Sequence, residues 1–331
     1  MNGAATVWRV IGGLSDYWCL AAAVELEVVP HLTDGPATAD ELARSCGAEP
    51  GRMRALLGGL VAMELLRVSD GRYALCDAAA EVLIPGRPGY MGQLVLESPG
   101  PADNWPALAR TTRGQPPPHP VEDDGGRFYR SLVTATFPVQ YQAARAVTAE
   151  LELDRRDAAL RILDLGTGAA PWGAALLEAF PAARAVANDL PEVLPVAEEH
   201  LTRLGLVDRV ELRGGDYMTV PLEPAGFDIA VLGHVCRAEG GEGAARLVAR
   251  AAEALCAGGL LILADYPLDN DNSGPSQALR LGVTMMASTR RGAMFTVAEA
   301  ERWLLDAGLG PAERTTPVPP TTVLLSRKER P

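Results

Sequence analysis

From Ala159 onward, short apolar runs alternate with segments of helical periodicity, and this alternation limits the folds open to the chain. The apolar runs occupy residues 161–165, 184–189, 209–216, 227–235, 258–265 and 321–327. Helix-like stretches separate most of them, at residues 174–179, 192–204, 244–255 and 297–307. Such alternation predicts right-handed crossovers and a Rossmann-like α/β fold with a doubly wound, mostly parallel sheet. We therefore expect the ligand-binding residues at the carboxyl ends of the strands.

The first strand ends in a glycine turn that is typical of nucleotide-binding proteins. Gly166 and Gly168 allow a ligand to approach the backbone closely, and the N-terminus of the following helix favours anions. Ala170 stands where a dinucleotide-binding turn carries its third glycine. Asp164, at the end of the strand itself, suits a ligand with a cationic amine better than a diphosphate. The turn thus predicts a nucleotide site and argues against a pyrophosphate.

Acidic residues follow the next two strands. Asp189 lies roughly 20 residues beyond Gly168, a spacing at which a carboxylate accepts hydrogen bonds from a ribose diol. Asp216 follows the third strand and can accept a hydrogen bond from an adenine amino group, while Tyr217 beside it can supply an aromatic face. The alternative for Asp216 is a turn or cap residue. Together these strand ends favour a ligand that contains ribose and adenine.

The N-terminal region has a different pattern. Apolar residues recur at helical spacing over residues 7–32, and the capping-box pair Thr38 and Glu41 marks the start of a further helix. Another helix is predicted at residues 52–63, and Asp70–Gly71 between two apolar runs indicates a hairpin. Helix, helix and hairpin form the outline of a winged helix.

The winged-helix outline does not indicate DNA binding in this chain. Its second helix offers only Arg52 and Arg54 as cations, and the whole chain has a formal net charge of −12. Nucleic-acid partners need a clustered basic surface that neutralises phosphates. We therefore interpret the region as a dimerisation or packing module, and we expect a homodimer with no nucleic-acid partner.

Sequence runs over nearly the whole chain resemble the bacterial small-molecule O-methyltransferase family. They are residues 36–66, 163–181, 186–200, 209–218, 227–237, 257–268 and 295–309, and the string 189–193 is among the most specific. Members of this family are S-adenosylmethionine-dependent class I methyltransferases with an N-terminal winged-helix dimerisation domain. The resemblance implies three regions: residues 1–100 for dimerisation, 101–155 as a linker with helices over the substrate pocket, and 156–331 as the catalytic domain.

The resemblance also implies S-adenosylmethionine as the cofactor and S-adenosylhomocysteine as its product. Gly166 and Gly168 would line the methionine part, Asp189 would hold the ribose, and Asp216 and Tyr217 would border the adenine. The full predicted set of cofactor residues is Asp164, Gly166, Gly168, Asp189, Leu190, Asp216, Tyr217, Gly233 and His234.

The family's catalytic histidine has no counterpart at the expected place. In the family this histidine follows the fourth strand and removes the proton from a substrate hydroxyl, because a phenol with a pKa of about 10 needs such help at neutral pH. Here Cys236 and Arg237 stand where a Leu-His pair is expected, and a guanidinium cannot act as a base. His234, three residues earlier, is the nearest other candidate; capping the strand or contacting the cofactor is its alternative role. Arg237 and His234 are the predicted catalytic residues.

Three interpretations follow from this departure. The protein methylates a small aromatic or keto-acid natural-product precursor at a carbon, nitrogen or oxygen that needs little deprotonation, and Arg237 holds a carboxylate or phenolate of the substrate. Alternatively, His234 or Tyr17 serves as the base. In the third, the fold retains the cofactor but performs a cyclisation, hydroxylation or decarboxylation, or binds the cofactor without catalysis.

Residues 282–296 correspond to the family's pocket helix and the loop after it. Its methionines offer adaptable apolar walls, although plain core packing is an equal alternative. Residue 17 lies on the helix that in relatives crosses the dimer and touches the partner's site. The predicted substrate residues are Tyr17, Trp105, Phe128, Phe137, Tyr141, Met285, Met286 and Arg290.

Other features of the sequence are less specific. The five cysteines form no CxxC pair, which favours reduced thiols, and no convergent set of metal ligands is evident, so we expect no metal. No apolar run reaches the roughly 18 residues that a membrane span needs, and the N-terminus lacks a signal-peptide pattern. We therefore expect a cytoplasmic protein with no membrane partner.

Overall fold

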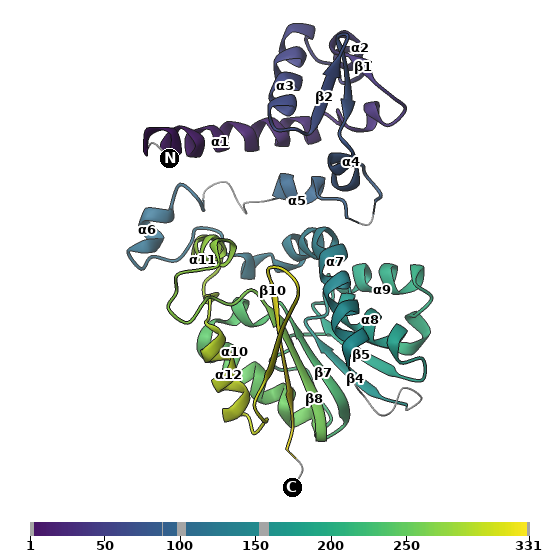
Figure 1. Ribbon diagram of the computed structural model, residues 1–331, viewed down its shortest axis with the longest axis vertical. Coiled ribbons are helices and arrows are strands. Elements are labelled where there is room, and N and C mark those ends of the chain that lie inside the picture. The colour runs from purple at the N-terminus through teal and green to yellow at the C-terminus, as the bar shows by residue number, and fades with distance from the viewer. Residues whose placement is uncertain (1–2, 88, 98–103, 152–158, 330–331) are drawn as a thin grey trace. The chain divides into compact units, whose positions relative to one another are not determined.

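The computed structural model describes residues 3–87, 89–97, 104–151 and 159–329. The chain divides into two compact units, residues 1–98 and 99–331, each with its own apolar core (Figure 1). Residues 104–151, most of the predicted linker region, belong to the second unit.

The first unit is a helical domain with a small sheet. Its elements are α1 (Gly3–Glu25), η1 (Pro30–Leu32), β1 (Ala37–Thr38), α2 (Ala39–Ser45), α3 (Pro50–Ala62), β2 (Leu66–Ser69), β3 (Arg72–Leu75), α4 (Asp77–Leu83) and α5 (Gly92–Glu97). The strands pair antiparallel in the order β1-β3-β2. Leu42, Met53 and Leu57 are buried in the core that α2 and α3 share with the sheet.

Local signals in the sequence determine how this unit turns. The Thr38 hydroxyl accepts a hydrogen bond from Glu41 N at 3.2 Å, and the Glu41 carboxylate accepts one from Thr38 N at 2.7 Å, so the predicted capping box is confirmed. Asp70 and Gly71 both have positive φ, 50° and 73°, as a two-residue hairpin turn requires. The predicted winged-helix outline is therefore confirmed.

The second unit contains the remaining elements. They are α6 (Leu108–Thr112), η2 (Val121–Asp123), α7 (Gly125–Glu150), β4 (Arg161–Leu165), α8 (Pro171–Ala179), β5 (Arg184–Asp189), α9 (Leu194–Arg203), η3 (Val207–Arg209), β6 (Val210–Gly214), β7 (Phe227–Gly233), α10 (Cys236–Ala254), β8 (Leu255–Asp265), α11 (Ser276–Ser288), α12 (Val297–Asp306), β9 (Glu313–Val318) and β10 (Thr321–Arg327).

The second unit is built on a seven-stranded sheet of order β6-β5-β4-β7-β8-β10-β9. The first five strands of this order are parallel, while β10 runs antiparallel to both β8 and β9. This topology confirms the predicted Rossmann-like, mostly parallel fold. The chain proceeds from β4 to β5 and β6 on one side and then to β7 and β8 on the other. The carboxyl ends of β4, β5 and β7 therefore border the position where such sheets bind ligands.

Helices cover both faces of this sheet (Figure 1). On one face α7, α8 and α9 pack through Val147, Leu176 and Leu201, and on the other α10 and α12 pack through Leu247 and Trp303. The sequence did not reveal β9, which carries Pro317 and four polar residues. Proline is tolerated at the edge of a sheet, where β9 lies, so the pattern of a buried strand is absent there.

Candidate functional site

The turn after β4 has the backbone conformation of a nucleotide-binding loop. Gly166 and Gly168 have φ of 67° and 58°. Ala170, which replaces the third glycine of the dinucleotide pattern, has φ of 59° and directly precedes α8. The left-handed conformation is therefore retained at a position that carries a methyl group, at a cost in strain.

The Asp164 carboxylate connects this turn to the start of α8 by hydrogen bonds. Its Oδ2 accepts hydrogen bonds from the Thr167 hydroxyl at 2.8 Å and from Gly173 N at 3.2 Å. The side chain is buried, and this burial raises the pKa of Asp164 to about 6 against the opposing effect of both hydrogen bonds. A cationic amine beside this carboxylate would favour its ionised form.

Asp189 connects the end of β5 to the glycine turn. Its Oδ2 accepts a hydrogen bond from Gly168 N and its Oδ1 accepts one from Leu190 N, both at 2.7 Å. Burial raises the pKa of this carboxyl group. A carboxylate oxygen has more than one lone pair, so both oxygens can still accept from the hydroxyls of a ribose. The predicted cofactor residues Gly168, Asp189 and Leu190 thus lie together.

The turn after β6 brings Tyr217 to the same edge. A Cβ placed on Gly166 would lie 3.5 Å from Tyr217 Cδ1, so the ring lies against the glycine turn. The Tyr217 hydroxyl donates to Glu239 Oε1 at 2.8 Å, and burial is the main reason why the pKa of Tyr217 is raised. Asp216 is exposed, and its Oδ1 accepts from Met218 N at 2.8 Å. The turn role that the sequence left open for Asp216 is therefore present in the structure.

Side chains of the protein itself fill the space beside three glycines in and near the turn. A Cβ on Gly168 would lie 2.9 Å from Val133 Cγ1, and one on Gly233 would lie 2.8 Å from the Trp172 ring. A Cβ on Gly166 would overlap Val235 Cγ1. Close packing therefore requires glycine at these three positions.

Replacing Gly166 with alanine should destabilise the protein and weaken cofactor binding, each by about 1–3 kcal/mol, because the new methyl group meets Val235 at positive φ. Thermal unfolding and calorimetric titration with S-adenosylhomocysteine measure both effects. Gly205→Ala is the matched control, because Gly205 has φ of 70° but open space around its Cβ position. Equal effects of the two substitutions would show that only backbone strain matters.

Four residues meet at the carboxyl ends of β7 and β8. Arg237 NH1 donates to Asp265 Oδ1 at 2.5 Å, and the guanidinium lies 5.5 Å from the centre of the Tyr266 ring. His234 Nδ1 is 3.9 Å from the same Asp265 oxygen, too far for a hydrogen bond. Burial opposes the charge of Arg237, but the Asp265 carboxylate and its hydrogen bond keep the pKa of the guanidinium above its ordinary value. The predicted catalytic residues, Arg237 and His234, therefore lie together around a carboxylate.

His234 is held by its backbone while its ring makes no hydrogen bond to the described residues. Its φ is 62°, its N donates to Ala264 O at 2.7 Å, and its ring lies 4.6 Å from that of Tyr266. Burial lowers the pKa of His234 to about 4, against the attraction of Asp265. The imidazole is therefore neutral at neutral pH.

Lowering the pH from 7 to 5 should reduce the free energy of unfolding by about 2 kcal/mol through His234 alone. The unfolded histidine takes up a proton below about pH 6.5, whereas the folded one stays neutral until about pH 4, so stability falls as pH falls through this window. Urea unfolding at both pH values measures the loss, and His234→Gln should reduce it. An unchanged pH dependence in that variant would contradict the assignment.

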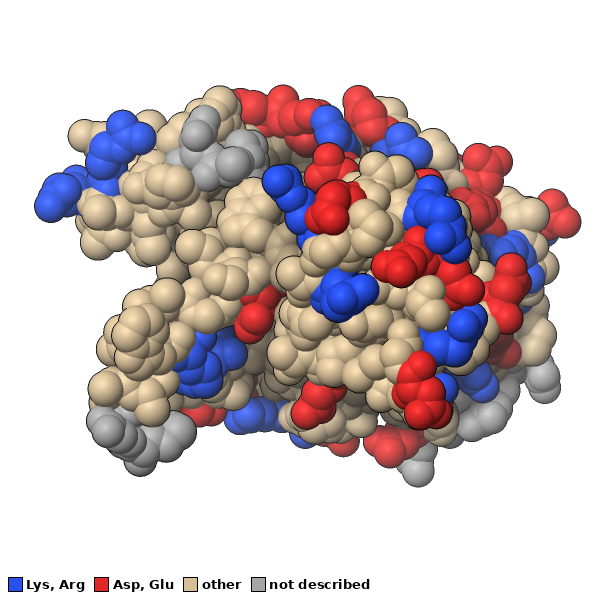
Figure 2. Space-filling model, turned by 90° about the horizontal axis from the view of Figure 1, so that it is seen from above, with Lys and Arg blue, Asp and Glu red and all other residues tan. Residues whose placement is uncertain are grey.

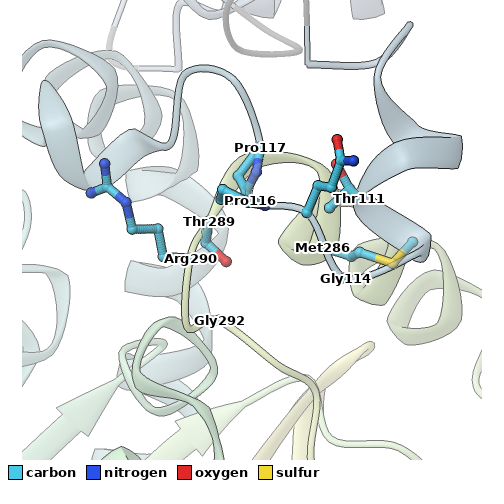
Figure 3. Close-up of a pocket in the computed structure, with 9 residues that line it drawn as sticks. Thr111, Gly114, Pro116, Pro117, Met286, Thr289, Arg290 and Gly292 are labelled. Carbon is cyan, nitrogen blue, oxygen red and sulfur yellow. The ribbon is translucent and has the colours of Figure 1, made fainter.

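A pocket of about 420 Å³ lies between the segment after α6 and the end of α11 (Figure 3). This volume is within the range of small-molecule sites. Its lining residues are Thr111, Gly114, Gln115, Pro116, Pro117, Met286, Thr289, Arg290 and Gly292. Ala293 N, next to this wall, donates to Arg237 O at 2.9 Å. A backbone hydrogen bond therefore connects the pocket wall to the start of α10.

Only some predicted substrate residues border this pocket. Met286 lines it, and Met285 lies one position before on α11, where its carbonyl accepts from the Thr289 hydroxyl. Arg290 also lines the pocket, but its guanidinium pairs with Asp123 at 2.7 Å and extends away from the other labelled residues (Figure 3). The guanidinium of this predicted substrate residue thus already has a carboxylate partner within the protein.

The predicted aromatic substrate residues lie on several elements. Phe137 and Tyr141 stack at 5.1 Å on α7, Phe137 also meets the His200 ring at 4.2 Å, and Tyr141 donates to Glu178 Oε1 at 2.6 Å. These contacts are those of helix packing and give no support to a substrate role. The others lie elsewhere: half-buried Trp105 before α6, half-buried Phe128 on α7, and Tyr17 on α1 with its hydroxyl on Val95 O.

Sequence reasoning missed three residues of this site. Asp265 is the last residue of β8, and the rule that ligand-binding residues lie at the carboxyl ends of strands would have found it. Glu239 and Tyr129 lie inside helices, where no local pattern identifies them. Glu239 accepts from Tyr217, and Tyr129 is close enough to Arg237 for the cation to oppose the effect of burial, which raises the pKa of Tyr129 to about 12.

Comparison with known protein families now adds to this geometry. Residues 139–310 match the O-methyltransferase domain, and residues 8–84 match the O-methyltransferase dimerisation domain. The chain belongs to the O-methyltransferase family. It is an S-adenosylmethionine-dependent methyltransferase, and its first unit contains the family's dimerisation domain.

Individual relatives align with most of the length of this methyltransferase. The tetracenomycin polyketide synthesis 8-O-methyl transferase TcmO of Streptomyces glaucescens is 31% identical over 94% of this chain and 93% of its own length. The N,N-dimethyltransferase OxyT of Streptomyces rimosus is 31% identical over 76% and 74%. The structure of PigF with SAH has the same fold, with a TM-score of 0.86 at 22% identity, over 99% of this chain and 100% of that one.

None of the described helices is both long and apolar enough to cross a membrane. Within the described ranges, no group of three or more His, Cys, Asp or Glu side chains is arranged to hold a metal ion. Figure 2 shows acidic and basic side chains interspersed over the face drawn, unlike the continuous basic surface that binds nucleic acid.

Proposed function

We propose that this methyltransferase methylates a small aromatic natural-product precursor without a histidine base at position 237. The observation that carries the proposal is the Arg237–Asp265 pair, at 2.5 Å, beside the predicted cofactor residues. Relatives named for polyketide O-methylation and for N,N-dimethylation support a small-molecule acceptor and leave oxygen and nitrogen open as the methylated atom. A relative named L-tyrosine C(3)-methyltransferase leaves carbon open as well.

The cofactor residues can hold S-adenosylmethionine by charge and by backbone approach. Asp164 would face the amine, the turn from Gly166 to Gly168 would pass beside the methionine part, and Asp189 would accept from the ribose hydroxyls. Tyr217 would border the adenine. When bound, the cofactor supplies a methyl group on a positively charged sulfur.

The acceptor side is arranged around a neutral ion pair. The Arg237–Asp265 pair carries no net charge as a whole, so neither a neutral nor an ionised acceptor meets an unpaired buried ion there. We propose that the pocket lined by Met286 and Thr111 holds the aromatic body and that the ion pair orients the polar end.

We further propose that the protein works as a homodimer through its first unit. The stripe of α1 that contains Ile11, Leu14 and Trp18 is exposed, which is unusual for a face of this size on a monomer. The match of residues 8–84 to a dimerisation domain supports a second copy as the partner.

The role of Arg237 can be tested with a panel of phenols, aromatic amines and β-keto acids. We expect the wild type to release S-adenosylhomocysteine with at least one member, and Arg237→Ala to lower kcat by about 10–100-fold through loss of orientation. Arg237→His provides the comparison with the family's usual residue. If neither substitution changes turnover, Arg237 has no part in the reaction.

A further inference from the structure

We propose that Asp265 is the proton acceptor of this reaction, and that the acceptor substrates carry an acidic hydroxyl, phenolic or enolic, conjugated with a carbonyl group. The inference rests on the proposed methyl transfer and specifies its substrate class. It is carried by one juxtaposition: a buried carboxylate oxygen to which none of the described residues donates lies beside another that accepts two hydrogen bonds.

The two oxygens of Asp265 have different surroundings. Oδ1 accepts from Arg237 NH1 at 2.5 Å and from Tyr266 N at 2.9 Å, so the orientation of the carboxylate is fixed. Oδ2 is buried, and none of the described residues donates to it. A buried acceptor without a donor is unfavourable, and such atoms in native proteins usually await a ligand or a water molecule. Oδ2 therefore offers a fixed position for the O–H of a substrate.

Among the ionisable groups around the substrate position, Asp265 is the anionic candidate for accepting a proton. Arg237 compensates the buried charge but cannot itself take up a proton. Burial raises the pKa of the Cys236 thiol and of the Tyr266 hydroxyl, so neither is a thiolate or phenolate at neutral pH. His234 is the competing base, because both of its ring nitrogens also lack partners.

The proposed step conserves atoms and charge. The acceptor oxygen gives its proton to Asp265 Oδ2 and forms a bond to the methyl carbon, while the electron pair of the broken carbon–sulfur bond stays on sulfur. The sulfonium thereby becomes a neutral thioether, the product is a methyl ether, and the protonated carboxyl group later returns its proton to water.

Carboxylates in general are weaker bases than imidazoles, and this difference bears on the class of substrate. An ordinary aspartate has a pKa of about 4 and an ordinary phenol one of about 10, so complete transfer from phenol to aspartate is uphill by about a millionfold. A hydroxyl conjugated with a carbonyl group is more acidic, and the gap shrinks accordingly. A carboxylate base in place of an imidazole therefore selects acceptors that lose their proton readily.

The test compares two naphthalene probes of similar size. One is 2-naphthol, which is protonated at neutral pH, and the other is 2-hydroxy-1,4-naphthoquinone, which is ionised. In the wild type we expect turnover of both, with the higher kcat/KM for the hydroxynaphthoquinone. Asp265→Asn should lower kcat on 2-naphthol by about 100-fold or more but on the hydroxynaphthoquinone by less than about 5-fold, because an ionised acceptor needs no base.

Binding and control variants separate this role from a structural one. The affinity for S-adenosylhomocysteine, measured by calorimetry, should stay within about twofold in Asp265→Asn, since the site of the ribose and amine is intact. Asp228→Asn is the matched control, because Asp228 lies at the opposite end of β7, where it accepts from Arg161 N at 2.9 Å. It should leave both rates unchanged.

Several outcomes would overturn the proposal. Equal losses of kcat on both probes in Asp265→Asn would show that Asp265 has a structural role. A loss of kcat on 2-naphthol alone in His234→Gln, without such a loss in Asp265→Asn, would show that His234 is the base. Methylation of amines or carbon acceptors but of neither probe would refute the acidic-hydroxyl class while the proposed methyl transfer stands. Absence of S-adenosylhomocysteine with every acceptor tested would refute the proposed function itself.

Discussion

Replacing Asp189 with alanine should weaken binding of S-adenosylhomocysteine by about 30-fold or more. Both oxygens of Asp189 are held in place by Gly168 N and Leu190 N at 2.7 Å, and this arrangement directs the carboxylate toward the edge of the sheet where ligands bind. Truncation of a buried charged hydrogen-bonding group costs about 2–5 kcal/mol, and each 1.4 kcal/mol is a factor of ten in affinity. Isothermal titration calorimetry measures the change.

Two variants show whether the loss reflects the ligand or the fold. Asp208→Ala removes a carboxylate from the exposed surface near β6 and should bind S-adenosylhomocysteine as the wild type does. Asp189→Asn keeps an acceptor for the glycine turn and should lose less affinity than Asp189→Ala. If Asp189→Ala keeps its thermal midpoint and still binds with wild-type affinity, Asp189 does not hold the ribose.

Placing two glutamates on α1, by Ile11→Glu and Leu14→Glu, should convert a dimer into a monomer. Leu14 is 64% exposed and the neighbouring Trp8 is 71% exposed, so a continuous apolar face is open on this helix. A second copy that covers this face would bury four glutamates without partners, at a cost of several kcal/mol. Sedimentation equilibrium at micromolar concentration should give twice the mass of one chain for the wild type and the mass of one chain for the variant.

The control for this prediction adds the same charge elsewhere. Leu305→Glu changes another exposed apolar residue, on α12, and should leave the oligomeric state unchanged. A wild type that is monomeric at these concentrations, or a double variant that remains dimeric, would contradict a dimer through α1.

The architecture of the second unit could be predicted because each strand and helix carries its own local signal. Continuous apolar runs predicted β4, β5, β7 and β8, which are buried on both faces, and the helices between them required a parallel sheet. The edge strand β9 was missed, since one partner and a proline leave no such pattern. Periodicity therefore predicts central strands better than edge strands.

The site was predictable only where its residues follow strands. Asp189 ends β5, His234 directly follows β7, and Tyr217 lies in the turn after β6, so the rule of strand ends predicts all three. Asp265 obeys the same rule, because it is the last residue of β8. The pairing of Arg237 with Asp265 joins the ends of different elements, and such a contact depends on the sheet order rather than on any local pattern.

Aromatic residues could not be assigned from the sequence. Phe137 and Tyr141 lie one helical turn apart on α7, a spacing that serves a substrate wall and a packing face equally well. The contacts with His200 and Glu178 are formed by α9 and α8 and become visible only in three dimensions. The same limit applies to Arg290, whose ion pair with Asp123 spans more than a hundred residues of sequence.

The central claim is methyl transfer from S-adenosylmethionine at the ends of β4, β5, β7 and β8. Its most direct test is the stoichiometry of one reaction, run with methyl-labelled S-adenosylmethionine and an accepted phenol. We predict one labelled, methylated product for each S-adenosylhomocysteine released. Conversion of the acceptor to product without label and without release of S-adenosylhomocysteine would contradict the account.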